Sequence, residues 1–168
     1  MSGATTHLVL DTPIGPLLLV GDDTDLSAVW FAEPLRGKEI GERRERGDAP
    51  APLQETARQL EEYFRGERQD FDLPLAPEGT DFQRRVWDRL RQIPYGQTRS
   101  YGQIAAEIGQ PRASQAVGAA NGRNPLSIVV PCHRVVGSTG AVTGYAGGQE
   151  RKQTLLDLER RISGGGLF

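Results

Sequence analysis

Short apolar runs separated by turn residues dominate the first thirty positions of the chain. Segments 7–10 and 17–20 are largely apolar, and the connector 12–16 between them contains two prolines and a glycine. Apolar runs of this length on either side of such a connector predict a β-hairpin. Residues 26–31 form a further apolar run after a Gly-Asp-Asp turn. The N-terminal part is therefore expected to form a small sheet.

The hydrophobic period disappears after this sheet and then returns with helical spacing. Segment 33–52 is charged, contains glycine and proline and has no period, so we expect a mobile loop there. Apolar residues recur every three or four positions over 53–65, which predicts a helix that ends before Gly66. Residues 71–77 have the composition of an extended linker.

The pattern beyond the linker is helical. Helices are predicted over 80–93 and 101–108, each opened by a capping box in which Thr or Ser precedes Gln by three positions. A third helix is expected over 112–121, after a Gly-Gln-Pro turn. Two short helices joined in this way match a helix-turn-helix, although the same pattern also occurs in ordinary helical cores.

The last part of the chain mixes short apolar segments with glycine-rich connections. We expect a buried strand over 128–130, a second apolar pair at 135–136 and a glycine-rich loop over 143–148. The final helix is predicted over 149–162, and the tail that follows it, 163–168, is expected to fray.

These elements predict a mixed α/β (α+β) protein with two domains. The N-terminal domain, 1–79, is a small β-sheet with one helix and the mobile loop 33–52. The C-terminal domain, 80–168, is mostly helical and carries the helix-turn-helix. With 168 residues and 37% hydrophobic content, the chain can bury only a modest core.

Charge separates the two parts in the same place. Residues 1–79 carry 16 acidic and 8 basic side chains, whereas residues 80–168 carry 6 acidic and 12 basic ones. Eleven of those 12 are arginines, which suit phosphate recognition, so the C-terminal part is expected to face a polyanion such as nucleic acid. The plainer alternative is that these charges lie on solvated helix faces.

Composition also limits location and cofactors. No segment approaches the ~20 apolar residues of a membrane helix, and no signal-peptide pattern is present, so we expect no membrane contact. The single cysteine forbids an internal disulfide and favours a reducing compartment, which we take to be the cytoplasm. One cysteine and two histidines also fall short of a structural zinc site, so we expect no metal.

The single cysteine is the strongest candidate for chemistry. Cys132 lies in the segment Pro131-Cys132-His133-Arg134, so the one sulfur nucleophile stands next to one of only two imidazoles. A thiolate needs a base or a lowered pKa to form at neutral pH, and histidine is the usual base. Adjacent side chains diverge in regular structure. Either Pro131 turns the backbone or a water molecule bridges the two groups. The residue pattern leaves open which carboxylate orients the histidine.

Residues 131–135, Pro-Cys-His-Arg-Val, have neighbours that make them recognisable. Asn124-Pro125 precedes them, and Gly-Tyr-Ala-Gly-Gly follows at 144–148. This arrangement resembles the active-site signature of the O6-alkylguanine-DNA alkyltransferases, the methylated-DNA–protein-cysteine methyltransferase family. The resemblance covers 80–168 closely and the N-terminal part loosely. It implies a ribonuclease H-like N-terminal sheet domain and a winged-helix-like C-terminal domain.

The resemblance also implies a reaction. Cys132 would accept the alkyl group of O6-alkylguanine irreversibly, in a single turnover and without a cofactor, after the base is flipped out of the duplex. Activity toward O4-alkylthymine is left open. His133 would remove the thiol proton through a water molecule, with Glu159 orienting its imidazole. Tyr101 would protonate the leaving guanine, and Asn124 would act as a hinge. The substrate pocket would be formed by Val135, Tyr145, Ala146 and Gly147.

Double-stranded DNA is the partner that the resemblance implies. A monomer would bind the minor groove through the helix-turn-helix, with contacts from Arg112, Ala113, Ser114, Gln115, Ala116, Gly118 and Arg123. Two positions depart from the family pattern. Gln115 stands where the family usually has an arginine that fills the space of the flipped base, and Ala146 replaces a small hydroxyl residue of some relatives. The zinc ligands that some members carry in the N-terminal domain are missing.

Two other functions compete with alkyl transfer. A non-catalytic alkyltransferase-like protein would bind the same lesions, but such proteins lack the nucleophilic cysteine, which Cys132 supplies here. A cysteine hydrolase unrelated to DNA would turn over small esters or amides, and the arginine-rich C-terminal part does not support it.

Overall fold

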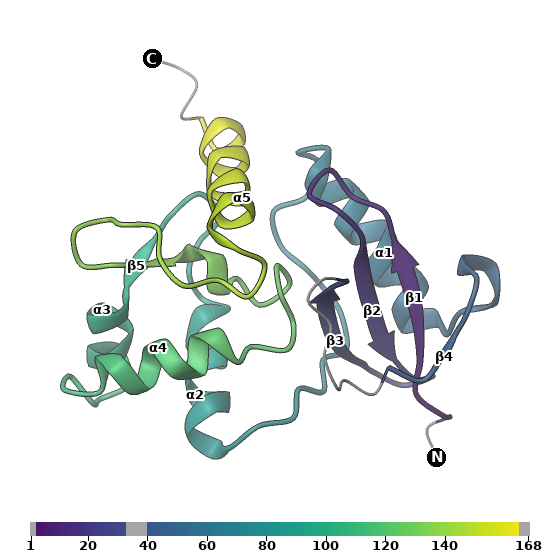
Figure 1. The fold of residues 1–168 in the computed structure, drawn as a ribbon, viewed down its shortest axis with the longest axis horizontal. Helices are drawn as coiled ribbons and strands as arrows, with labels where there is room; N and C mark the ends of the chain where they lie inside the picture. Colours follow the sequence, from purple (N-terminus) through teal and green to yellow (C-terminus); the bar gives the residue numbers. More distant parts are fainter. Residues whose placement is uncertain (1–2, 33–39, 165–168) are drawn as a thin grey trace. The chain divides into compact units, whose positions relative to one another are not determined.

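The computed structural model describes residues 3–32 and 40–164. The chain forms two compact units, Met1–Glu78 and Gly79–Phe168 (Figure 1). Each unit has its own buried apolar residues.

The predicted hairpin and third strand of the first unit are confirmed. Strand β1 (Thr6–Leu10) pairs antiparallel with β2 (Leu17–Gly21), and β2 pairs antiparallel with β3 (Leu26–Phe31). Leu10 lies opposite Leu17 at the hairpin end, where the positive φ of Gly15, 106°, fits the turn. The sheet order is β3-β2-β1-β4.

The expected mobile loop over 33–52 is wrong for the part that the structure describes. Residues 33–39 lie outside the described residues, but Glu42–Arg43 forms β4, which pairs parallel with β1. A 3-10 turn, η1, follows at Arg46–Asp48. Gly41 makes this pairing possible, because its φ is +69° and a Cβ there would meet the Thr5 carbonyl oxygen. Edge pairing through the backbone needs no apolar period, which is why the sequence pattern missed it.

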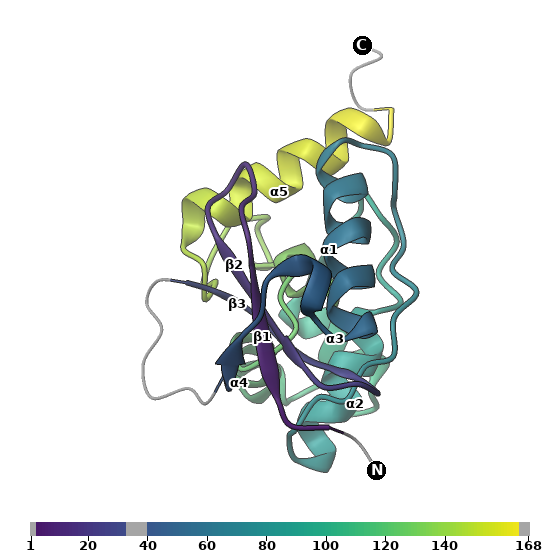
Figure 2. The same cartoon turned by 90° about the vertical axis from the view of Figure 1, so that its right-hand side faces the viewer.

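One helix covers a face of this sheet. Helix α1 (Ala51–Phe64) begins two residues before the predicted start and contacts β1, β2 and β3 (Figure 2). The predicted stripe is buried at Leu53, Ala57 and Leu60. The extended segment 71–77 is more than a linker, because the Leu26 amide donates to Pro74 O at 2.8 Å and the Ala76 amide donates to Leu26 O at 2.9 Å.

The second unit contains the predicted helices. They are α2 (Asp81–Leu90), α3 (Tyr101–Glu107) and α4 (Ser114–Gly122). Both capping boxes form as predicted, at the starts of α2 and α3. Helix α4 starts two residues later than expected. Trp87 Nε1 on α2 donates to Ala120 O on α4 at 2.8 Å, which holds the helix-turn-helix against α2.

The predicted buried strand over 128–130 is wrong. The segment is buried, but it is folded into two consecutive tight turns rather than extended. The Val129 amide donates to Ser127 O at 2.8 Å around Ile128, whose φ is +73°, and the Cys132 amide donates to Val130 O at 2.7 Å around Pro131. Both are three-residue γ-turns. The turn around Pro131 is the common inverse type, and the turn around Ile128, with its positive φ, is the strained type.

The site is completed by two further elements. Strand β6 (Val135–Val136) pairs parallel with β5 (Arg99–Ser100). Helix α5 (Gln149–Ile162) has the predicted bounds. Within residues 3–32 and 40–164, no helix is both long and apolar enough to span a membrane.

Candidate active site

Cys132 opens a 3-10 turn, η2 (Cys132–Arg134), directly after the second γ-turn, and is 4% exposed. Burial raises the pKa of its thiol to about 11, although a hydrogen bond from Asn124 and the charge of Lys152 act in the opposite direction. No direct hydrogen bond joins the thiol to His133 among the described residues. The backbone does turn at Pro131, which was one of the two expected arrangements. The turn does not bring the Cys132 thiol and the His133 imidazole into direct contact.

His133 and Glu159 form the central pair of the site. Nε2 of His133 lies 2.6 Å from Oε2 of Glu159, and both side chains are almost completely buried. Burial lowers the pKa of the imidazole, and the nearby Glu159 only partly opposes this effect. The imidazole is therefore neutral at pH 7 and able to accept a proton. Its other nitrogen, Nδ1, is buried and has no hydrogen-bond partner within the described part of the chain.

Glu159 accepts hydrogen bonds at both of its carboxylate oxygens. Arg134 donates from Nε to Oε1 at 2.8 Å and from Nη2 to Oε2 at 3.0 Å. The Gly96 amide donates to Oε1 at 3.2 Å. Burial acts to raise the pKa of this carboxyl, but the bonds from His133 and Arg134 outweigh it and hold the pKa well below its usual range. Glu159 is therefore ionised.

Asn124 ties the end of the helix-turn-helix to the backbone before the thiol. Its Nδ2 donates to Val130 O at 2.8 Å, and its Oδ1 accepts from the Leu126 amide at 3.0 Å. These two bonds span the strained turn at Ile128. Asn121, which sequence reasoning missed, lies on α4 and donates from Nδ2 to Cys132 O at 3.3 Å.

Lys152 is the second residue that the sequence reasoning missed. Its side chain is fully buried, and its ammonium group donates to Val135 O and, at 2.6 Å, to Thr143 O. The lysine thereby joins α5 to strand β6 and to the start of the loop 143–148. A signal was available, because Lys152 precedes Leu155 by three positions and Glu159 by seven, which places all three on one face of α5.

Tyr101 and the loop 143–148 lie together. The Tyr101 hydroxyl is 3.3 Å from Thr143 Oγ1. A Cβ at Gly118 on α4 would lie 3.7 Å from the Tyr101 ring, so the helix runs close to the tyrosine there. Tyr145 is half-buried with its hydroxyl oxygen inside the fold, whereas Ala146 is exposed. The predicted pocket residue Val135 is fully buried, and its carbonyl oxygen is the one that Lys152 contacts.

The predicted DNA-contacting residues occupy α4 and its flanks. Arg112, Gln115, Ala116 and Arg123 are exposed, and Ala113, Ser114 and Gly118 are partly exposed. Residues 110–113 line a shallow hollow at the turn of the helix-turn-helix. The catalytic candidates Cys132, His133, Glu159 and Asn124 are thus buried, Tyr101 is partly buried beside the loop 143–148, and the DNA candidates lie at the surface of the unit. In the described segments, no three His, Cys, Asp or Glu side chains are grouped as metal ligands would be.

Both units match models of a single protein family. Residues 6–77 match the family described as 6-O-methylguanine DNA methyltransferase, ribonuclease-like domain, and residues 81–161 match its DNA binding domain. The chain belongs to the 6-O-methylguanine DNA methyltransferase family.

Relatives match the chain over nearly its whole length. The methylated-DNA–protein-cysteine methyltransferase of Methanosarcina acetivorans is 50% identical over 153 residues, which are 91% of this chain and 97% of that protein. The protein of the same name from Mycolicibacterium paratuberculosis is 49% identical and covers 94% of this chain and 93% of its own length. A crystal structure of Mycobacterium tuberculosis OGT in complex with DNA superposes with a TM-score of 0.86 at 46% identity, covering 94% of each chain.

Proposed function

We propose that this protein repairs alkylated DNA by direct reversal, with Cys132 as the acceptor of the alkyl group of O6-alkylguanine. Transfer is irreversible and each molecule acts once. The observation that carries the proposal is the buried array of Cys132, His133 and Glu159 in a chain of this family. Double-stranded DNA is the substrate, which agrees with the matched DNA binding domain.

The neutral imidazole supplies the base for this reaction. Nδ1 of His133 takes the Cys132 proton through a bridging water molecule, and the sulfur attacks the alkyl carbon as its bond to guanine O6 breaks. The electron pair of that bond passes to the guanine, and Tyr101 donates a proton to meet the developing charge. Tyr101 regains a proton from solvent and His133 releases the one it took. The thioether that remains on Cys132 does not hydrolyse, so no second turnover follows.

Two backbone carbonyls hold the amine of the flipped base in this proposal, those of Cys132 and Val135. The Val135 oxygen accepts from Lys152, and the Cys132 oxygen accepts from the Val135 amide and, at 3.3 Å, from Asn121 Nδ2. A carbonyl oxygen has two lone pairs, so in this proposal the base amine displaces the long Asn121 bond at the Cys132 oxygen. Tyr145, Ala146 and Gly147 form the loop over the pocket, and Asn124 couples it to α4 as a hinge.

We also propose that α4 enters the minor groove and that a single copy of the chain binds the lesion. The exposed positions Arg112, Gln115, Ala116 and Arg123 support this placement, because they lie on or beside one short helix with small residues between them. Small side chains allow the helix backbone to approach the DNA closely. Flipping is required since the reacting atom is out of reach in stacked DNA. No metal or cofactor takes part in this scheme.

Mass spectrometry after incubation with excess O6-methylguanine duplex tests the proposal. The protein should gain one methyl group on Cys132, and Cys132→Ala should gain none. Replacing His133 by Ala should slow the transfer by roughly 10²–10⁴-fold, the usual contribution of a general base. Several methyl groups removed per protein molecule would contradict single use. Tight lesion binding without any mass change would instead identify a non-catalytic lesion sensor, and turnover of small esters would identify a hydrolase.

A further inference from the structure

Arg134, the last residue of the Pro-Cys-His-Arg segment, is held on every side yet has no part in the reaction as proposed. It is 5% exposed, and its two bonds to Glu159 form a fork that matches both carboxylate oxygens. Its third nitrogen, Nη1, donates to Ile93 O at 2.7 Å, and its Cζ lies 5.5 Å from the centre of the Tyr95 ring. A guanidinium fixed in this way also fixes the plane of the Glu159 carboxylate.

The fork determines which atom carries the proton in the bond between Glu159 and His133. An ionised carboxylate can only accept hydrogen bonds. The 2.6 Å bond must therefore be donated by Nε2–H of His133. A neutral imidazole has one N–H, so its lone pair lies on Nδ1. That is the buried nitrogen without a partner in the described structure, and the one that the proposed reaction uses as the base.

The charge of Arg134 has a second effect. The charged and titratable groups around His133 come from three places: Cys132 and Arg134 on η2, Lys152 and Glu159 on α5, and Tyr95 and Tyr145 on the connecting segments. The buried charges near His133 are therefore two cations, Arg134 and Lys152, and one carboxylate, Glu159. Burial is the main cause that lowers the pKa of the imidazole, and the two cations add to it by opposing part of the attraction of Glu159 for an imidazolium.

We propose that Arg134 is a positioning residue that acts through Glu159, fixing His133 in the Nε2–H tautomer and limiting how readily the imidazole binds a proton. The effect on the alkyl-transfer rate rests on the proposed function. The tautomer of His133 does not, so the two can be tested separately.

Nitrogen NMR of protein labelled in its histidines tests the tautomer without any alkyl transfer. The chain has two histidines, and His7→Gln assigns the signals by removing the one in the first unit. His133 should show a protonated Nε2 and a lone pair on Nδ1 at neutral pH. Arg134→Gln should add a population of the other tautomer. A parent protein with the proton on Nδ1 would overturn the proposal whatever its activity.

The pH dependence of single-turnover transfer from free O6-benzylguanine tests the charge effect, since this substrate needs no DNA. Only neutral His133 acts as a base, so the rate falls on the acid side as His133 becomes protonated. Arg134→Gln removes a cation and should move this acid limb to higher pH by about one unit, whereas Glu159→Gln removes the anion and should move it to lower pH. Arg134→Lys keeps the charge but loses the paired hydrogen bonds to Glu159. The acid side of its pH–rate profile should therefore be unchanged, while the plateau rate falls.

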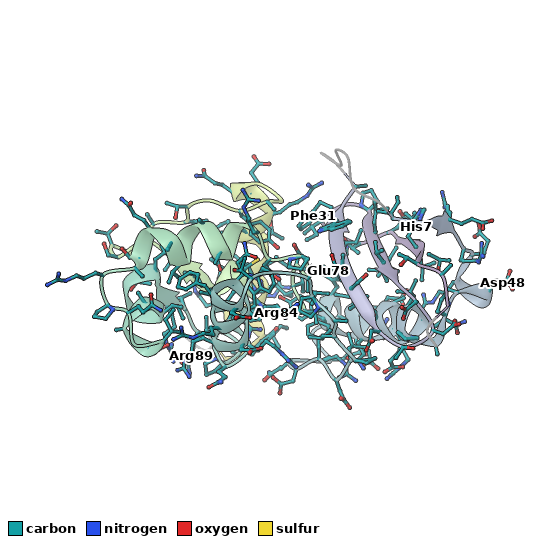
Figure 3. The ribbon with its side chains drawn as sticks, turned by 90° about the horizontal axis from the view of Figure 1, so that it is seen from below. His7, Phe31, Asp48, Glu78, Arg84 and Arg89 are labelled. Carbon is teal, nitrogen blue, oxygen red and sulfur yellow. The ribbon has the colours of Figure 1, made fainter. Side chains whose placement is uncertain are left out.

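The matched control is Arg84→Gln, the same change of charge at an exposed arginine on α2 (Figure 3). Its acid limb should coincide with that of the parent. A slower Arg134→Gln enzyme with an unmoved limb would reduce Arg134 to a structural role and overturn the proposal. If Arg134→Gln does not fold, Arg134→Lys decides: a plateau rate and a His133 tautomer equal to those of the parent would overturn the proposal.

Discussion

Single buried residues set the protonation state of this site before any substrate arrives. Burial holds the Cys132 thiol protonated, with its pKa raised to about 11, and it holds His133 neutral by lowering the imidazole pKa. The resting pair is therefore a thiol and a neutral imidazole rather than a thiolate and an imidazolium. Proton transfer must then accompany the attack on the alkyl carbon, which explains why the orientation of His133 by Glu159 matters.

Gln115 is the residue whose identity carries the most specific prediction about DNA. It is exposed on the first turn of α4, and the resemblance noted in the sequence implies an arginine at this position in the family. An inserted side chain offsets part of the few kcal/mol lost when a base leaves the stack. Gln115→Ala should therefore slow repair of an O6-methylguanine duplex but leave the reaction with free O6-benzylguanine unchanged. Gln115→Arg should match or exceed the parent on the duplex.

Single-turnover rates with the two substrates check this prediction, and Gln69→Ala, the same change at an exposed glutamine of the first unit, serves as the control. The neighbour Arg112, also exposed, offers the positive charge that glutamine lacks. If Gln115→Ala repairs the duplex at the parental rate, the side chain only spaces the helix from the DNA.

Among the elements, those with a strong local signal could be predicted and those held by distant contacts could not. Helices α2 and α3 have capping boxes and apolar stripes, which are local, and both begin within one residue of the predicted start, although α2 ends three residues earlier than expected. The strand expected at 128–130 does not form, because Asn124 Nδ2 donates a hydrogen bond to the Val130 carbonyl and the backbone turns at Ile128. A run of β-branched residues cannot reveal such a competing side-chain bond.

The same distinction applies to the elements of the site. Cys132 and His133 could be found because they are adjacent in a recognisable motif. Glu159 came only from the resemblance, since it reaches His133 across 26 positions of the chain. The roles of Asn121 and Lys152 depend on backbone carbonyls, which every residue has, so the shared face of Lys152, Leu155 and Glu159 could indicate that the lysine is buried but not which groups it binds.

At the scale of the whole molecule, charge is divided between the two units. The first unit carries a net charge of −8 and the second +6. Some arginines of the second unit are neutralised within it, as Arg89 is by Glu107 and Arg134 by Glu159. Arg112 and Arg123 flank α4 and take part in no salt bridge in the described residues, so they are available to phosphates.

DNA affinity should consequently depend steeply on salt. Each neutralised phosphate releases condensed counterions, so two such contacts, one from each of these arginines, imply a loss of roughly twelvefold between about 50 and about 200 mM salt. Arg112→Gln and Arg123→Gln should each reduce the slope of log affinity against log salt by about one. Arg58→Gln, on α1 of the acidic unit, should leave the slope unchanged. Fluorescence anisotropy with a labelled duplex measures all four proteins, and a flat salt response in the parent would contradict the assignment.

The burial of Cys132 has a consequence for how long the protein remains usable. Oxidants attack the thiolate, and oxidation beyond the sulfenic acid is irreversible in the absence of a dedicated rescue enzyme. A thiol that is 4% exposed, with a pKa of about 11, presents almost no thiolate at neutral pH. Loss of the Cys132 thiol in dilute peroxide should thus be far slower in the folded protein than in urea-unfolded protein, as thiol titration over time would show. Because each molecule reacts only once, protection of the Cys132 thiol from oxidation preserves its activity until a lesion is bound.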